Sequence, residues 1–138
     1  ARLSVQREQS LFAWDAFRFS TGATTPDSAA GWRQLGTAFM AHDAPQPGTV
    51  PIFVETPVAA PGTQFHLAHR TPAQAAQAGW QQSGVSFHAF MYPAAETIPV
   101  YREARNGYFH FSVRSAAASA LEGFSQQDVA FYAYPADA

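Results

Sequence analysis

The sequence predicts a mainly β protein with short helices, in which three internal repeats close around a pseudo-threefold axis. Two observations lead to this fold class: an aromatic motif that recurs at a regular spacing, and segments in which apolar and polar residues alternate as they do in strands. The motif is Gly-Trp at residues 31–32 and 79–80, and loosely Gly-Phe at 123–124. The copies are therefore about 48 and about 44 residues apart, the length of one small supersecondary unit.

The chain is expected to form a single domain, residues 1–138, because 47 % of its residues are hydrophobic and only 13 % are charged. The repeats cover approximately residues 3–46, 49–95 and 97–136. One such unit cannot bury its aromatic face alone, so the three are expected to close on one another. A β-trefoil is favoured because it has three units of about this length with a hairpin in each. A helix in each copy fits a trefoil poorly, so other threefold closures stay open.

Each repeat is expected to contain a strand, a loop, a second strand, a short helix and a third strand. The opening strands are predicted at 3–8, 51–55 and 99–103, and the closing strands at 36–42, 84–90 and 128–134. Asn106-Gly107 is the strongest turn signal, because both central positions of a type I′ turn need a positive φ. It predicts that 100–103 pairs with 108–113 in a hairpin.

The predicted helices begin at capping signals. Thr-Pro at 71–72 is an N-cap followed by proline at the first helical position, and Gly79 is a natural stop. Thr-Pro at 25–26 repeats the signal in the first copy, and Ser115 is expected to cap the helix of the third. Aromatic residues at matching positions are predicted to form the core, namely Phe17, Phe65, Phe109, Phe39, Phe87, Phe131, Trp32 and Trp80.

The composition excludes several classes of function. A net charge of −2 gives no electrostatic attraction for nucleic acid. The absence of cysteine excludes disulfides, zinc–thiolate sites and a cysteine nucleophile. No apolar run reaches the roughly 18 residues that a membrane span needs. A chain that starts at Ala1 is compatible with a mature secreted protein that has lost its signal peptide.

The repeats resemble a family of extracellular three-copy aromatic repeats of unassigned function. Its pattern is Tyr-Arg, then His-Phe-Tyr-Thr, then Gly-Trp after a short helix, then Glu-Gly-x-Ala-Phe-Tyr. Tyr-Arg at 101–102, Gly-Trp at 79–80 and Ala-Phe-Tyr at 130–132 match it, whereas Tyr108 and Gln64 stand where the family has histidine. The resemblance covers nearly the whole chain and identifies a divergent member. It implies a non-catalytic accessory role outside the cell, beside secreted hydrolases, and it transfers no site residues.

Three glutamates occupy one equivalent position, at the end of each opening strand: Glu8, Glu55 and Glu103. A retained acid can be the partner of an arginine, a cap for a loop backbone, or an acceptor for sugar hydroxyls. Threefold symmetry would hold these carboxylates too far apart for glycoside hydrolysis, which needs about 5–9 Å.

In each repeat the second predicted strand carries a polar residue directly after a phenylalanine. These polar residues are Arg18, His66 and His110. Because phenylalanines assigned to the core flank it, the position is interpreted first as a solvated outer face of the sheet. The functional alternative is a polar contact in a repeated pocket. No dense cluster of histidine and acidic residues has metal-ligand spacing, so neither a metal nor another cofactor is expected.

Trp14 is the tryptophan outside the repeat pattern, so it either plugs the end of the barrel or forms an exposed platform beside Asp15.

No serine-nucleophile motif and no phosphate-binding glycine loop occurs, so enzymatic activity is not expected. The sequence instead favours a secreted, lectin-like module that binds a cell-wall or surface glycan. Its expected contacts are Glu8, Glu55, Glu103, Arg18, His66, His110 and Trp14. The alternative is a module that docks onto a protein partner, and an unrecognised hydrolase is the third hypothesis.

Overall fold

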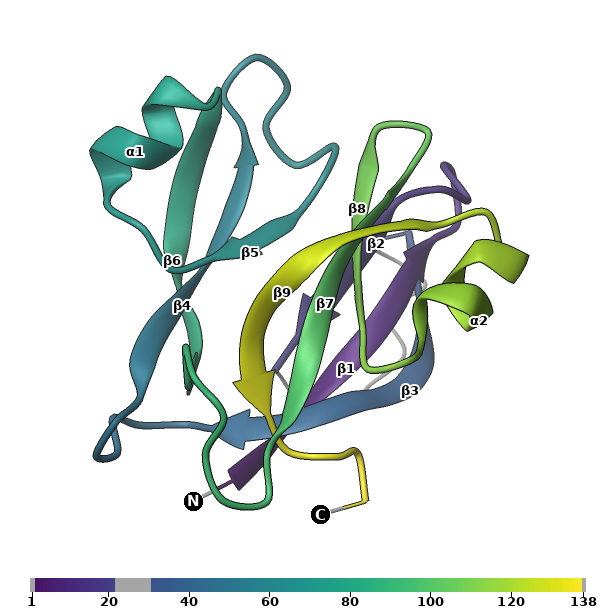
Figure 1. Cartoon of the computed structure of the whole chain (residues 1–138). Coiled ribbons are helices and arrows are strands. Elements are labelled where there is room, and N and C mark those ends of the chain that lie inside the picture. Colours follow the sequence, from purple (N-terminus) through teal and green to yellow (C-terminus); the bar gives the residue numbers. More distant parts are fainter. Residues whose placement is uncertain (1, 22–30, 138) are drawn as a thin grey trace.

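The computed structural model describes residues 2–21 and 31–137, which form a mainly β protein with two short helices (Figure 1). The strands are β1 (Arg2–Ser10), β2 (Phe17–Ser20), β3 (Trp32–His42), β4 (Val50–Pro57), β5 (His66–Ala68), β6 (Trp80–Ala89), β7 (Ile98–Arg105), β8 (Tyr108–Ser112) and β9 (Ser125–Ala133). The helices are α1 (Pro72–Gln77), between β5 and β6, and α2 (Ala116–Leu121), between β8 and β9. Both lie on the outside of the molecule (Figure 1).

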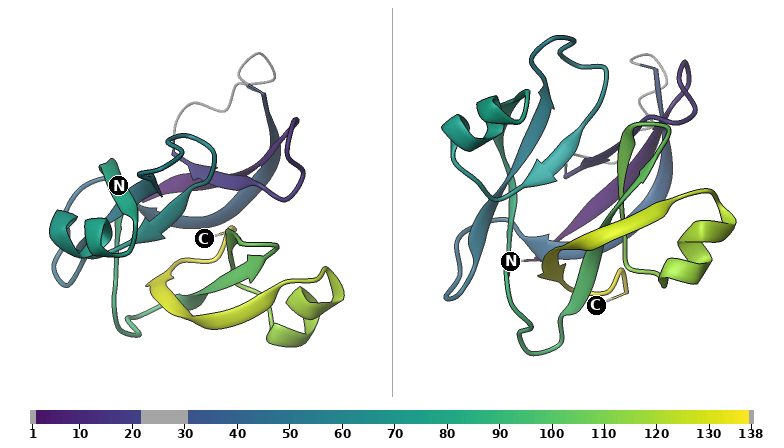
Figure 2. Two further views of the ribbon diagram at one scale, coloured as in Figure 1. Left: turned by 90° about the horizontal axis from the view of Figure 1, so that it is seen from above. Right: turned by 45° about the horizontal axis from the view of Figure 1, so that its top comes forward.

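The strands pair in three sets that share one order, with the first strand of each set between the second and the third. These are the N-terminal set (β2-β1-β3), the middle set (β5-β4-β6) and the C-terminal set (β8-β7-β9). In each set the pairing of the first and third strands shifts register twice, between equivalent residues. Such bulges increase the local twist of a strand, which accords with the strong curl of the sheets in Figure 2.

The three sets meet where their third strands end. A single residue pair, His42 and His88, joins β3 to β6, and isolated bridges join Met40 to Tyr134 and Phe90 to Tyr132. Seen from above, the sets surround one shared interior (Figure 2).

Three phenylalanines from the third strands fill that interior. The rings of Phe39, Phe87 and Phe131 lie edge to face, with centroids 5.6, 5.5 and 5.4 Å apart. Each is at most 1 % exposed. Val5, Ile52 and Val100, one from each first strand, are also fully buried. Edge-to-face rings at this separation add to the stabilisation from burial.

The local predictions agree with these elements. Four of the six predicted opening and closing strands lie within observed ones, and the predicted strands at 84–90 and 128–134 end one residue beyond β6 and β9. Asn106 and Gly107 form a two-residue turn between Arg105 and Tyr108, with φ of 53° and 82°. Thr71 caps α1 in a capping box with Gln74, and Ser115 caps α2. The predicted cap at 25–26 lies outside the described residues.

Two expectations are not met in full. The β-trefoil is not confirmed: the N-terminal and middle sets form one six-stranded sheet, and the C-terminal set forms a separate three-stranded sheet. A single residue pair joins the first two sets, and isolated bridges join the two sheets. Of the eight predicted core aromatics, Phe17, Phe39, Phe87 and Phe131 are buried, whereas Phe65, Phe109, Trp32 and Trp80 are half-buried. Of these four, Phe65, Trp80 and Phe109 line clefts at the junctions between sets.

Candidate functional site

Three clefts lie at the three junctions between sets, each beside a second strand. The β2–β4 cleft is lined by Arg18, Phe19, Ser20, Thr21, Val54, Phe65, Leu67 and Ser86. The β5–β7 cleft is lined by residues that include His66, His69, Arg70, Trp80, Met91, Arg102, Phe109, Gln127 and Asp128. The β8–β1 cleft is lined by Arg7, Ala38, His110, Phe111, Ser112, Val113 and Arg114. Arg18, His66 and His110, which the sequence places at one position, thus line one cleft each.

The three glutamates lie behind these clefts and are inaccessible to a ligand. Glu8 is 4 % exposed, and Glu55 and Glu103 are fully buried. Each faces the polar residue of its second strand in the sheet register: Glu8 opposite Arg18, Glu55 opposite His66, and Glu103 opposite His110. The geometry therefore favours the partner role among the three expected of these acids over contact with sugar hydroxyls.

The Glu55 carboxylate receives hydrogen bonds from several directions. His66 Nδ1 lies 3.0 Å from Oε1, and Arg70 Nε donates to Oε2 at 2.9 Å. Gln82 holds the arginine in place by donating to the Arg70 carbonyl oxygen at 2.8 Å. Burial raises the pKa of the Glu55 carboxyl, but the bonds from His66 and Arg70 outweigh it and lower the pKa to about 2.

Glu103 is held by a matching set of donors. His110 Nδ1 lies 2.7 Å from Oε1, Ser112 Oγ donates to Oε2 at 3.0 Å, and Ser119 of α2 also donates to Oε2. Arg114 Nε donates to the Ser119 hydroxyl at 2.9 Å. Burial again raises the pKa of this carboxyl, and the bonds from His110 and Ser119 overcome it, so that the pKa is about 2.

Two arginines extend these contacts across the junctions between sets. Arg102 of β7 donates from Nε to His66 Nε2 at 3.0 Å, and Arg7 of β1 donates to His110 Nε2 at 2.8 Å. Because Nε2 accepts in both cases, each ring is neutral and carries its proton on Nδ1, which donates to the glutamate. The result is two buried Arg–His–Glu relays, one between the C-terminal and middle sets and one between the N-terminal and C-terminal sets.

Burial lowers the pKa of both histidines. For His66 the hydrogen bond to Glu55 opposes this shift and the Arg102 charge adds to it. For His110 the corresponding groups are Glu103 and Arg7. A proton on Nε2 would also remove the acceptor for the arginine, so both relays require neutral imidazole.

The interpretation of His66 and His110 as residues of a solvated outer face is wrong. They are 6 % and 2 % exposed. Their strands lie at the edge of one set, but the neighbouring set covers that edge: Phe109 of the C-terminal set packs on His66 with a ring-centroid distance of 4.7 Å. Trp80 of the middle set, to which His66 itself belongs, packs on the same ring at 5.2 Å. The alternation of residues within one strand could not reveal a ring that covers it from another set.

The β2–β4 cleft lacks the relay. Arg18 replaces the histidine, donates to Glu8, and stacks with its guanidinium 4.6 Å from the centre of the Trp32 ring. Val54 stands where Arg7 and Arg102 stand in the other sets, one residue before the glutamate. A valine cannot reach across the junction as the arginines do, so Val54 makes no such contact with β2.

Trp14 lies apart from these clefts, in the loop between β1 and β2, with 62 % of its surface exposed. Of the two expectations for Trp14, the structure therefore agrees with the exposed platform. The Arg105 guanidinium lies 4.4 Å from the centre of its ring and 4.3 Å from that of Phe124. Asp15 fixes that arginine by accepting from Nε at 2.8 Å.

Sequence reasoning missed the arginines and glutamines that hold the glutamates. Arg70 and Arg114 each stand one residue before a helix N-cap, and Gln82 and Gln126 lie opposite Glu55 and Glu103 on the third strands. The members of each pair are about 44 residues apart, the spacing predicted between the second and third repeats. A comparison of the second and third predicted repeats, position by position, would have shown that these polar residues are identical in both.

The β5–β7 cleft combines aromatic rings with accessible polar groups in a space of about 420 Å³. Trp80 and Phe109 are half-buried on its wall, and the Asp128 carboxylate is 53 % exposed while it accepts two bonds from Arg102, at 2.6 and 2.8 Å. His69 is exposed and hydrogen-bonds the Pro51 carbonyl through Nδ1, which leaves Nε2 as an acceptor. The charges of Arg70 and Arg102 are balanced by Glu55 and Asp128, so the cleft is close to neutral.

Among residues 2–21 and 31–137, no group of three or more histidine and acidic residues has a geometry that would hold a metal ion. The helices of this part of the chain are too short to cross a membrane.

The strand sets and their clefts define a β-rich domain with candidate binding sites at its internal junctions. A family model described as a domain of unknown function, DUF5648, matches residues 62–138. The chain therefore belongs to the DUF5648 family. No curated protein and no solved structure is significantly similar to the chain.

Proposed function

We propose that this protein is a secreted, non-catalytic module that binds a neutral sugar of a cell-wall or surface glycan in the β5–β7 cleft. The observation that carries the proposal is the meeting of two aromatic rings, Trp80 and Phe109, with the exposed polar groups of His69, Gln127 and Asp128 in one cleft. Aromatic faces pack on the C–H faces of a sugar, while carboxylate, amide and imidazole groups bond its hydroxyls.

The proposal includes three copies of one unit arranged around a pseudo-threefold axis. It is supported by the same strand order in each set, by the mutual contact of Phe39, Phe87 and Phe131, and by a cleft at each junction. The copies are unequal, because the β8–β1 cleft is smaller, about 150 Å³, and no acidic side chain lines it. We therefore expect one dominant sugar site instead of three.

The three tryptophans provide the test, because each indole N–H gives its own NMR signal. Titration with oligosaccharides from a glycan and peptidoglycan screen is expected to shift the Trp80 signal and leave Trp14 unchanged, with a dissociation constant of about 10 µM to 1 mM for one site. Gln127→Ala is expected to weaken binding several-fold, and Trp14→Ala is the matched control. A blank screen, or shifts confined to Trp14, would exclude the β5–β7 cleft as a sugar site.

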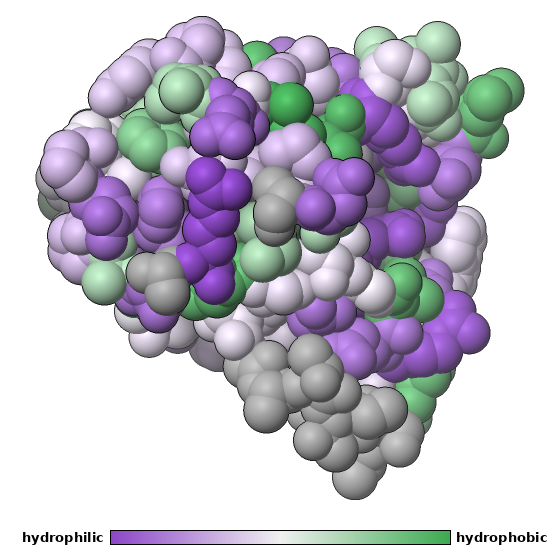
Figure 3. Space-filling view, turned by 90° about the horizontal axis from the view of Figure 1, so that it is seen from below, coloured by the Kyte–Doolittle hydropathy of each residue, from purple (hydrophilic) through white to green (hydrophobic). Residues whose placement is uncertain are grey.

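A second candidate, docking of a partner protein, is favoured by the loop between β1 and β2. Its side chains Leu11, Phe12 and Trp14 are 50, 88 and 62 % exposed, and they are close in sequence. By contrast, the face in Figure 3 mixes hydrophilic and scattered hydrophobic residues without one broad apolar patch. Loss of partner binding in Phe12→Ser, with sugar binding intact, would establish this second role.

A further inference from the structure

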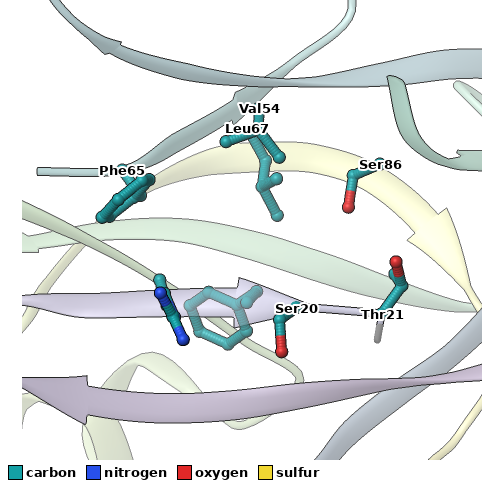
Figure 4. Close-up of a pocket in the computed structure, with 8 residues that line it drawn as sticks. Ser20, Thr21, Val54, Phe65, Leu67 and Ser86 are labelled. Carbon is teal, nitrogen blue, oxygen red and sulfur yellow. The ribbon is translucent and has the colours of Figure 1, made fainter. Parts of the chain in front are cut away.

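The β2–β4 cleft differs from the other two junctions in what crosses it. At those junctions an arginine reaches from the first strand of one set to the histidine of another, at 3.0 and 2.8 Å. Here Val54 holds the arginine position and lines a cavity of about 340 Å³ (Figure 4). A cavity of about 150 Å³ with apolar walls accommodates benzene, so this space has room for one ring with a substituent.

The walls of the cavity combine hydroxyl groups with apolar side chains, which include Phe19 of β2. Val54, Phe65 and Leu67 lie on one side, Ser20 and Thr21 lie opposite, and Ser86 stands at one end (Figure 4). The side-chain hydroxyls of Ser20, Thr21 and Ser86 make no hydrogen bond to another residue of the described part of the chain. Accessible hydroxyls among apolar side chains suit a flat ligand whose ring faces are apolar and whose edge forms hydrogen bonds.

The charge in the cavity is already compensated. Arg18 lines one end, but it is engaged with the Glu8 carboxylate and the Trp32 ring. An anionic ligand would have to compete with Glu8 for this arginine, and it would carry an uncompensated charge against Val54 and Leu67. A sugar, which has hydroxyls around its whole ring, would leave several of them unpaired on the same wall.

We propose that the β2–β4 cleft is a second binding site, separate from the sugar site, for a small uncharged aromatic molecule with one hydroxyl group, a phenol. The ring lies against Val54, Phe65 and Leu67, and its hydroxyl bonds the serine and threonine side. This site depends on neither Trp80 nor Asp128, so it can fail or succeed independently of the proposed sugar binding.

The test is titration of the full chain with 4-methylphenol, followed through the methyl signals of Val54 and Leu67 in ¹H–¹³C NMR. Saturable shifts of both residues are expected. Toluene, which lacks the hydroxyl, and 4-methylbenzoate, which is charged, are expected to bind at least fivefold more weakly. Shifts produced by methyl glucosides at Val54, or methylphenol shifts confined to the β5–β7 cleft, would overturn the assignment.

Two variants locate the site, and each has a control. Val54→Arg restores the arginine of the other junctions and fills the cavity, so it is expected to weaken methylphenol binding at least tenfold. Val85→Arg, at a half-exposed valine of β6, is the control and is expected to bind normally. If Val54→Arg does not fold, Ser86→Ala replaces it; this change is expected to weaken binding of methylphenol severalfold but not that of toluene. Unchanged methylphenol binding in a folded Val54→Arg or Ser86→Ala protein would refute the proposal.

Discussion

At the scale of single residues, a buried carboxylate stays ionised at low energetic cost only while other side chains donate hydrogen bonds to it. Glu55 is fully buried, and its hydrogen bonds come from His66 and Arg70. Glu55→Gln removes the negative charge and leaves the arginine without its counterion. Loss of one partner of a buried ion pair costs about 3 kcal/mol, and we expect this decrease in the free energy of unfolding, measured by urea denaturation.

The control for this change is Glu96→Gln. Glu96 has a side chain that is 79 % exposed, and its contact with Arg2 is a distant 4.0 Å. Exposed ion pairs contribute little, so the effect is expected to stay below about 0.5 kcal/mol. Equal losses in Glu55→Gln and Glu96→Gln would mean that the buried carboxylate has no special role in stability.

The phenylalanine triangle is the second feature at this scale. Phe131→Ala removes a ring that is 1 % exposed and contacts both Phe39 and Phe87. We expect a loss of about 3–5 kcal/mol, because the cavity adds to the lost burial. Leu121→Ala, at a side chain that is 90 % exposed, is expected to change stability by less than about 0.5 kcal/mol in the same assay. A small effect of Phe131→Ala would indicate that the three sets do not depend on this contact.

The candidate site was predictable at this scale only in part. Equivalent positions in the three predicted repeats singled out two groups of residues: Glu8, Glu55 and Glu103, and Arg18, His66 and His110. The burial of His66 was not predictable, because the rings that cover it include Phe109 from another set, about 40 residues away. Asp128 was missed for a similar reason: the matching positions of β3 and β6 hold glycine, and its partner Arg102 is identified only by the pairing of β7 with β9.

At the scale of elements, local signals were sufficient wherever the structure depends on neighbours in the sequence. The Asn106-Gly107 turn and the caps at Thr71 and Ser115 are examples, since the atoms involved are at most a few residues apart. The closing strands begin earlier than expected, at Trp32, Trp80 and Ser125. The polar residues at their starts pair with the ends of the first strands, so pairing and not hydrophobicity extends these strands.

The capping box of α1 gives a prediction at this scale. Thr71 accepts from the Gln74 backbone N–H, and the Gln74 side chain accepts from the Thr71 backbone N–H. Thr71→Ala is expected to cost about 1 kcal/mol, because a six-residue helix depends strongly on its cap. Thr71→Ser keeps the hydroxyl and is the control. The difference is to be read from thermal unfolding, and similar stability of the two variants would contradict the role of the cap.

At the scale of the whole molecule, few backbone hydrogen bonds join the three sets, so side chains supply much of the connection. The core phenylalanines contribute apolar contacts, and the Arg102–His66–Glu55 and Arg7–His110–Glu103 relays contribute polar ones. The relays hold the C-terminal set against both of its neighbours. Their protonation state therefore affects how the sets are joined, and not merely one local contact.

The last prediction concerns pH. Both histidines have a pKa below the usual 6.5, so the folded state binds fewer protons than the unfolded state at acidic pH. Their stabilising effect is complete above about pH 6.5 and is lost as the pH falls from there through the lowered pKa values. Each histidine can contribute up to about 1.4 kcal/mol per pH unit in that range. The glutamates add a second loss, from about pH 4.5 down to their pKa of about 2.

We therefore expect the free energy of unfolding to decrease between pH 7.5 and pH 5, before the carboxylates begin to titrate. The doubly substituted protein His66→Gln with His110→Gln tests the cause, because a glutamine side chain can accept from the arginine and donate to the glutamate without gaining a charge. Its stability is expected to be nearly constant over this range in urea denaturation, whereas His69→Gln, at an exposed histidine, keeps the slope of the parent protein. A parent protein with equal stability at pH 7.5 and pH 5 would show that the relays do not join the sets through neutral imidazole. A slope that persists in the double variant would assign the effect to other groups.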